Sequence, residues 1–199
     1  MAKIGLYYPV AAKITAETYG SVPTYGTGIV IGKAITADVT INTNDNPLYA
    51  DGAIAENDRS FSDGTVKLGV DDISMETEAA LLGGKYTAES KETESPTPET
   101  IIKSSGQTAP YFGFGFYKKG MKANVPYFEA TWLYKVQFAP FSENGKTKEK
   151  SIEWQTPEIE GSVMIVDGYE DGAYETKAKF TSESAARTWL NTLANITED

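Results

Sequence analysis

A cluster of carboxylates is the part of the sequence best suited to chemistry. The segment INTNDNPLYADGAIAENDRSF, residues 41–61, contains four acids: Asp45, Asp51, Glu56 and Asp58. Acidic loops with Asn and Gly bind calcium, and paired carboxylates hydrolyse glycosidic bonds. The segment is therefore a cation site, a hydrolytic site, or a polar arm without chemistry.

Neither chemical interpretation fits well. Aligning Gly52 with the sixth position of an EF-hand loop puts Pro47 and Tyr49 at the first and third positions, where oxygen ligands are needed. A non-standard cation site remains open. A glycosidase needs two carboxyl groups about 5–9 Å apart across a cleft, and the sequence does not give that distance. Because the chain has 28 acids, some pair always looks suggestive, and we favour a solvated loop.

The composition excludes other functions. There is no Cys and no His, so disulfides, thiolate metal sites and a Ser-His-Asp triad are impossible. The formal charge of −10 argues against a protein that reads nucleic-acid sequence. Any enzymatic chemistry in this chain would have to use carboxylates, Lys, Ser or Tyr. The N-terminus does not read as a signal peptide, and no apolar run reaches the about 18 residues of a membrane span. Synthesis in a reducing cytoplasm fits this composition.

Two glycine motifs read better as strands than as nucleotide sites. GTGIVIGKA, residues 26–34, misses the glycine spacing of a phosphate-binding loop, and Ala34 replaces its hydroxyl. GFGF, residues 113–116, alternates glycine with phenylalanine, which predicts a strand whose glycine face lets another backbone approach closely. We assign the three tryptophans to the core rather than to an exposed sugar platform: Trp132, Trp154 and Trp189.

Period-two alternation dominates the chain. KAITADVTIN has an apolar face and a polar face, as in a half-buried antiparallel strand. The predicted strands are residues 33–42, 64–70, 111–117, 128–138, 150–156, 160–166 and 175–180. Turns are expected at residues 118–120, 143–145 and 171–172.

Two helices are expected among the strands. In SESAARTWLNTLAN, Ser182 is the N-cap, and an apolar stripe follows: Ala186, Trp189, Leu190 and Leu193. In DDISMETEAALLGG, Asp72 caps the helix and Gly83-Gly84 ends it, with a strand over residues 73–77 as the competitor. We expect one mainly-β (α+β) domain over residues 1–199, a β-sandwich or barrel with helices outside. Long loops are expected at about 43–62 and 85–109.

Six segments of this chain resemble one family. In chain order they are IGKAITADVTINTND, LYADGAIAENDRSFSDGTVKLGVDDIS, APYFGFGFYK, TWLYKVQFAPFSE, SIEWQTPEIEGSVM and AARTWLN. Together they resemble the major tail protein family of long-tailed phages (siphoviruses) and prophages of Gram-positive bacteria. The resemblance spans nearly the whole chain, and LYADGAIAENDRSF followed by GVDDIS is its most specific part.

The resemblance implies a structural role. Such proteins form rings, usually hexameric, that stack into the tail tube through which DNA is ejected. It implies the tail-tube β-sandwich or barrel with a flanking helix, and no C-terminal immunoglobulin-like domain in this chain. It also implies no catalytic residues, no cofactor site and no metal site, and hence no enzyme. The implied partners are other copies, the tape measure protein, and the tail terminator and distal tail proteins. DNA would pass through the lumen without sequence-specific binding, and the implied location is the virion tail.

The carboxylate-rich segment is then expected to be an assembly arm. Apolar residues interrupt it, which a purely solvated loop does not require. The residues expected to contact neighbouring subunits are Asp45, Leu48, Tyr49, Asp51, Ile54 and Phe61. We also expect lumen-facing acids to repel DNA. The alternatives are a carbohydrate-binding β-sandwich with a calcium ion under the acidic loop, and a carboxylate hydrolase.

Overall fold

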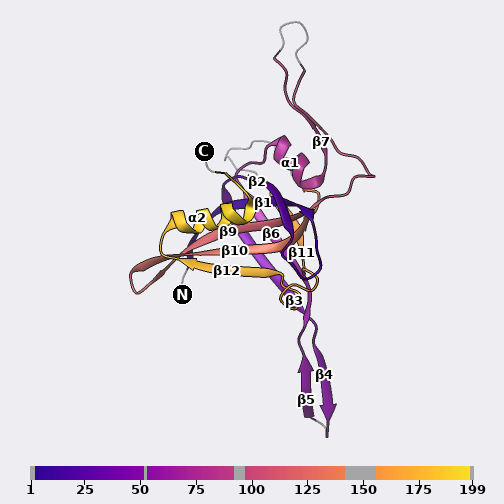
Figure 1. The fold of residues 1–199 in the computed structure, drawn as a ribbon, viewed down its shortest axis with the longest axis vertical. Helices are drawn as coiled ribbons and strands as arrows, with labels where there is room; N and C mark the ends of the chain where they lie inside the picture. Colours follow the sequence, from indigo (N-terminus) through magenta and orange to yellow (C-terminus); the bar gives the residue numbers. More distant parts are fainter. Residues whose placement is uncertain (1–2, 52, 92–96, 142–155, 198–199) are drawn as a thin grey trace, which may run out of the picture.

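The computed structural model describes residues 3–51, 53–91, 97–141 and 156–197 (Figure 1). In chain order these residues form β1 (Lys3–Ala16), β2 (Thr24–Val30), β3 (Ala34–Thr43), β4 (Asn46–Ala50), β5 (Ala53–Asp58), β6 (Phe61–Val70), α1 (Met75–Leu82), β7 (Lys85–Thr87), β8 (Thr100–Ile102), β9 (Tyr111–Lys122), β10 (Val125–Phe138), β11 (Glu158–Met164), β12 (Glu175–Phe180) and α2 (Glu183–Ala194). The predicted mainly-β fold with a flanking helix and a C-terminal helix is confirmed.

Eight strands form one antiparallel sheet in the order β2-β1-β9-β10-β11-β6-β3, with β12 attached to β10. Strand β10 changes partner along its length. Its residues 128–133 pair with β12 and its residues 135–138 pair with β11. The sheet curls so that β1 contacts β3, and the main core lies inside the curl. Alternate residues of the long strands fill this core: Val66, Leu68, Phe112, Phe114, Phe116, Leu133 and Val136.

Helix α2 covers the opposite face of β1, β9 and β10 (Figure 1). The Ser182 hydroxyl accepts a hydrogen bond from the Ala185 amide at 3.2 Å, which confirms the predicted N-cap. In the predicted stripe, Ala186 and Leu190 are fully buried, and Trp189 and Leu193 are partly buried against the same core. The stripe therefore joins the helix to the sheet.

The glycines of GFGF face Trp132. A Cβ on Gly115 would lie 2.6 Å from Trp132 Cε3 and 2.7 Å from Leu190 Cδ2. The closely approaching element is therefore the indole ring of β10 with helix α2, rather than another backbone as predicted. Because these glycines of β9 have no side chains, there is room for Trp132, the largest fully buried side chain.

Most predicted strands are confirmed: β3, β6, β9, β10, β11 and β12 correspond to six of the seven. The seventh, residues 150–156, and the predicted turn at 143–145 lie outside the described residues except for Thr156. The prediction of a turn at residues 118–120 was wrong. Strand β9 continues to Lys122, and the chain reverses at Ala123 and Asn124, which have φ of 49° and 61°. The turn at 171–172 is confirmed by φ of 56° and 93°.

Helix α1 starts two residues later than its predicted cap implies. The N-cap is Ser74, whose hydroxyl accepts from the Thr77 amide at 3.1 Å. Asp72 instead accepts from the adjacent Ile73 amide at 2.9 Å, so its carboxylate is already used before the helix begins. Gly83 ends the helix with φ of 76°, as predicted. Among the described helices, none is long and apolar enough to cross a membrane.

Candidate functional site: two protruding hairpins

The carboxylate-rich segment is a β-hairpin that leaves the body of the molecule (Figure 1). Strands β4 and β5 pair antiparallel from Asn46 opposite Asp58 to Ala50 opposite Ala53. The prediction of a loop over residues 43–62 was therefore wrong in its conformation. Its β-formers pair across the ribbon, and Asp51 has φ of 52°, which a two-residue hairpin turn requires.

Three apolar side chains on this hairpin are exposed. Leu48 is 59% exposed, Tyr49 65% and Ile54 57%. Tyr49 and Ile54 lie opposite each other across the two strands. A two-stranded ribbon has no second layer, so the rest of the described chain offers these side chains no core. The hairpin presents a small apolar surface at a distance from the body.

The other three predicted assembly residues are placed differently. Asp45 accepts a hydrogen bond from Asn57 Nδ2 at 2.7 Å and lies 3.8 Å from Arg59 Nε. Phe61 stacks on Tyr174 with ring centroids 4.8 Å apart. Asp45 therefore links the two sides of the hairpin base to each other, and Phe61 fixes that base to the body. Asp51 is at the exposed tip, together with the apolar surface.

A second arm extends from the opposite end of the molecule (Figure 1). Strands β7 and β8 pair antiparallel, and a bridge joins Ser90 to Thr97 further out. The described part of residues 85–109, predicted to be a loop, thus contains a short hairpin. Gln107 Nε2 donates to the Leu82 carbonyl at 2.6 Å, which fixes the segment after β8 to the end of α1. The two arms point away from each other along the longest axis.

The described residues give little support to a metal site, a phosphate-binding loop or a sugar-binding platform. Among them, no group of three or more acids could hold a metal ion. Residues 26–34 form β2, a short connection and the start of β3, not the strand-loop-helix unit of a phosphate site. Trp132 is fully buried and Trp189 packs on Phe180, so neither forms a sugar platform. Trp154 lies outside the described residues.

The strongly shifted groups are structural tyrosines. Burial raises the pKa of Tyr25, whose hydroxyl donates to the Tyr134 carbonyl at 2.8 Å. Burial and the hydrogen bond to Glu183 raise the pKa of Tyr117. Both hydroxyls hold α2 or β10 in place and stay protonated at neutral pH. They join core elements and do not point into a cleft.

Sequence reasoning missed the regular structure of both arms. Asp51-Gly52 between two runs with β-formers is a strong hairpin pattern, and it was available in the sequence. The opposite directions of the two arms depend on tertiary packing, so no local sequence pattern could predict them. No protein-family profile matches the chain, and no curated protein matches it significantly.

Proposed function

We propose that this chain is a self-assembling structural subunit whose copies form stacked rings in the tail tube of a siphovirus-like phage or prophage. The rings would be hexameric and would enclose the conduit for DNA ejection. The resemblance of six segments to the major tail protein family motivates the proposal. The observation that carries it is the protruding hairpin with exposed Leu48, Tyr49 and Ile54.

An exposed apolar surface on a thin ribbon favours a partner. Burying a large aliphatic or aromatic side chain contributes about 1.5–3 kcal/mol. A monomer gains nothing from holding three such side chains in water, whereas a neighbouring subunit that covers them gains this free energy, less the cost of association. The hairpin therefore suits a contact between subunits of successive rings.

The arrangement of the arms also supports stacking. The β4–β5 hairpin and the β7–β8 arm leave the body at opposite ends (Figure 1). A subunit in a stack needs contacts in both directions along the tube axis, and two opposed arms supply them. Each arm would reach a different neighbouring ring.

The remaining partners follow from the same proposal. A tail tube ends in a terminator protein and a distal tail protein and encloses a tape measure protein. Phage DNA would pass through its lumen without sequence-specific binding. The formal charge of −10 suits a lumen whose acids repel phosphates. The protein would be made in the host cytoplasm and reside in the virion tail.

Electron microscopy of the purified chain at high concentration tests the proposal. We expect rings or tubes from the unaltered chain and none from the triple variant Leu48→Ser, Tyr49→Ser, Ile54→Ser or from a deletion of residues 46–58. The matched control replaces three exposed apolar residues outside both arms: Ile4→Ser, Val30→Ser and Ile35→Ser. Tubes that form normally from the hairpin variants would refute the assembly role of the hairpin.

A further inference from the structure

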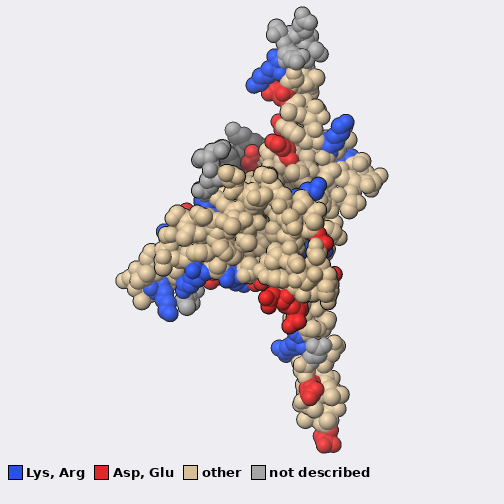
Figure 2. All heavy atoms as spheres, viewed as in Figure 1, with Lys and Arg blue, Asp and Glu red and all other residues tan. Residues whose placement is uncertain are grey.

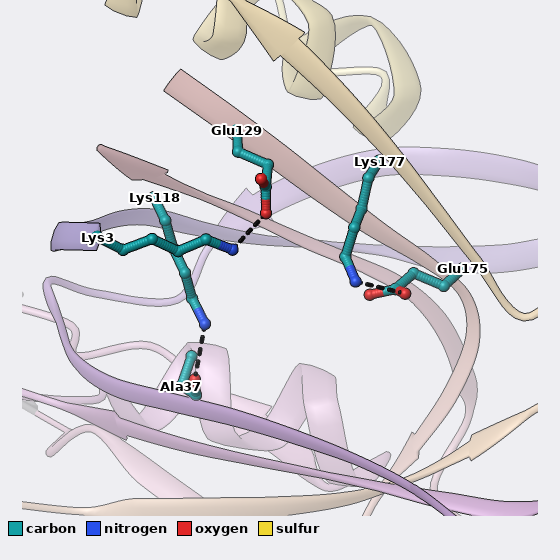
Figure 3. A network of polar contacts seen from close by, with 6 residues as sticks. All are labelled: Lys3, Ala37, Lys118, Glu129, Glu175 and Lys177. Carbon is teal, nitrogen blue, oxygen red and sulfur yellow. Dashed lines mark hydrogen bonds and ion pairs between the residues drawn. The ribbon is translucent and has the colours of Figure 1, made fainter. Parts of the chain in front are cut away.

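A face rich in lysine lies at the end of the body formed by β1, β9, β10 and β12. This lysine face consists of Lys3, Lys118, Lys122, Lys177 and Lys179, with Glu129 and Glu175 among them. Figure 3 shows Lys3 directed to Glu129, Lys177 to Glu175, and Lys118 to the Ala37 carbonyl of β3. Five lysines against two glutamates leave an excess of three positive charges.

The lysines are on one side of the sheet because of strand register. In the strand register, Lys118 of β9 lies opposite Glu129 of β10, and Glu129 lies opposite Lys179 of β12 on its other side. Strand alternation places Lys122 on the same side as Lys118. Burial, and then the nearby charges of Lys3 and Lys177, lower the pKa of Lys118, although Asp38 and Glu129 act in the opposite direction. An additional negative charge would relieve this repulsion.

Two of these lysines have no carboxylate partner in the described chain. Lys179 Nζ lies 3.9 Å from the centre of the Tyr127 ring, a cation–π contact, and Lys122 is exposed near the end of β9. They occur in a chain of formal charge −10. If the lysine face contributes +3, all other residues together carry −13, so another copy of this chain is an acidic partner.

An acidic turn lies at the other end of β12. The β11–β12 connection, residues 165–174, contains three exposed acids and no Lys or Arg: Asp167, Glu170 and Asp171. No ion pair in the described chain involves them. The turn is fixed, because the Gly172 amide donates to the Tyr169 carbonyl at 2.8 Å and Tyr169 packs edge-on against Tyr134. The acids are therefore presented in a defined position.

The two charged regions are too far apart to neutralise each other within one subunit. Residues 171 and 172 form a turn, and the roughly extended stretch from residue 173 to Lys179 spans about 20 Å. This length exceeds the Debye length of about 8 Å at physiological salt. Figure 2 shows basic side chains gathered at one end of the lower rim of the body and acidic side chains further along it, next to the hairpin base. One subunit thus carries complementary charges on two different surfaces.

We propose that the lysine face of one subunit docks on the acidic turn, residues 167–171, of the next copy in the ring. Such a head-to-tail contact uses two different surfaces, as a closed ring requires. Within the described chain β12 pairs only with β10, and lysines on an edge strand oppose backbone pairing with another strand. The contact is therefore made by side-chain charge. This inference rests on the proposed ring and specifies its lateral contact.

A charge-swap experiment tests the contact in the full-length chain. One variant carries Lys122→Glu and Lys179→Glu, and a second carries Glu170→Lys and Asp171→Lys. In sedimentation experiments we expect each alone to need more than about tenfold higher concentration to associate, because like charges then meet at the contact. A 1:1 mixture should associate nearly as well as the unaltered chain, since alternating subunits restore both complementary contacts.

The controls separate charge from folding. Lys13→Glu with Lys33→Glu makes the same change in formal charge outside both arms and outside the lysine face, and should leave association unchanged. The milder pair Lys122→Gln and Lys179→Gln should give an intermediate effect, and near-ultraviolet circular dichroism checks that each variant is folded. Normal association of both reversed variants, or no recovery on mixing, would overturn the contact. So would loss of binding to a short DNA duplex in the Lys→Glu variant with self-association unchanged, because the face would then bind phosphates.

Microscopy distinguishes this contact from the proposed function. Tubes from the unaltered chain and from every charge variant would leave the function standing and reject the contact. Charge-swap recovery without rings or tubes from any sample would support the contact and reject the tail-tube role.

Discussion

Apolar side chains are buried on one face of helix α2 and exposed on the β4–β5 hairpin. The helix lays Ala186 and Leu190 on a sheet face that contains the fully buried Trp132. The hairpin holds Tyr49 and Ile54 more than half exposed, away from the body. In the first region apolar area stabilises the monomer, and in the second it is available to another molecule. Changes in the two regions should therefore separate folding from assembly.

The largest effect is expected at Trp132. Replacing it by Ala leaves a cavity under α2 and removes the edge-to-face contact with Tyr25. Large aromatic-to-alanine changes in cores cost about 3–5 kcal/mol. Urea unfolding followed by circular dichroism measures this. A loss below about 1 kcal/mol would contradict the prediction that the Trp132 ring contributes strongly to the free energy of unfolding.

Adding one methyl group at Gly115 should destabilise the same region somewhat less. The new Cβ would meet Trp132 Cε3 at 2.6 Å and Leu190 Cδ2 at 2.7 Å. Overpacking of this kind costs about 1–3 kcal/mol. Gly106→Ala is the control, since a Cβ there meets nothing within 4 Å. Equal effects of the two substitutions on the urea midpoint would show that contact with the indole is not the cause.

Removing the cap of α2 tests how firmly the helix covers the sheet. Ser182→Ala deletes the acceptor for the Ala185 amide and should cost about 1 kcal/mol. Ser182→Asp keeps an acceptor and should preserve stability. Thermal unfolding of the two variants provides the comparison, and identical melting temperatures would speak against the cap.

The smallest effect on folding per substituted residue is expected in the hairpin. The triple variant Leu48→Ser, Tyr49→Ser, Ile54→Ser should change the free energy of unfolding by no more than about 0.5 kcal/mol per substitution, because exposed residues contribute little. The measurement is urea unfolding at a concentration where the unaltered chain is monomeric. A loss as large as that of Trp132→Ala would mean that the hairpin supports the body, and the contrast between the two regions would fail.

The sequence predicted those elements whose pattern is local. Val66 and Leu68 alternate with polar residues in β6, and Ser182 precedes an apolar stripe, so both elements were found. Strand β1 was missed, because Pro9 interrupts it and its neighbour β9 is distant in sequence. The cap of α1 was misplaced because Asp72 and Ser74 are both good caps, and only their hydrogen bonds distinguish them.

The candidate site was predictable in part. Apolar residues in a polar segment identified Leu48, Tyr49 and Ile54 as unusual, and the structure places them on one protruding hairpin. The stacking of Phe61 on Tyr174 could not be foreseen, because 113 positions separate them and the contact depends on how the β11–β12 connection packs against the start of β6. The lysine face was missed for the same reason, because Lys3, Lys118 and Lys179 come together only in the folded sheet.

The hydrogen bond from Tyr8 Oη to Asn191 Oδ1, at 2.8 Å, joins residues 183 positions apart. During synthesis, β1 leaves the ribosome long before α2, so the sheet face under the helix has no cover until translation is almost complete. Contacts so distant in sequence form slowly, and uncovered apolar faces aggregate. We therefore expect nascent chains halted before residue 183 to bind chaperones, and release of α2 to free them. Pulse-chase crosslinking of stalled chains of increasing length would time that release.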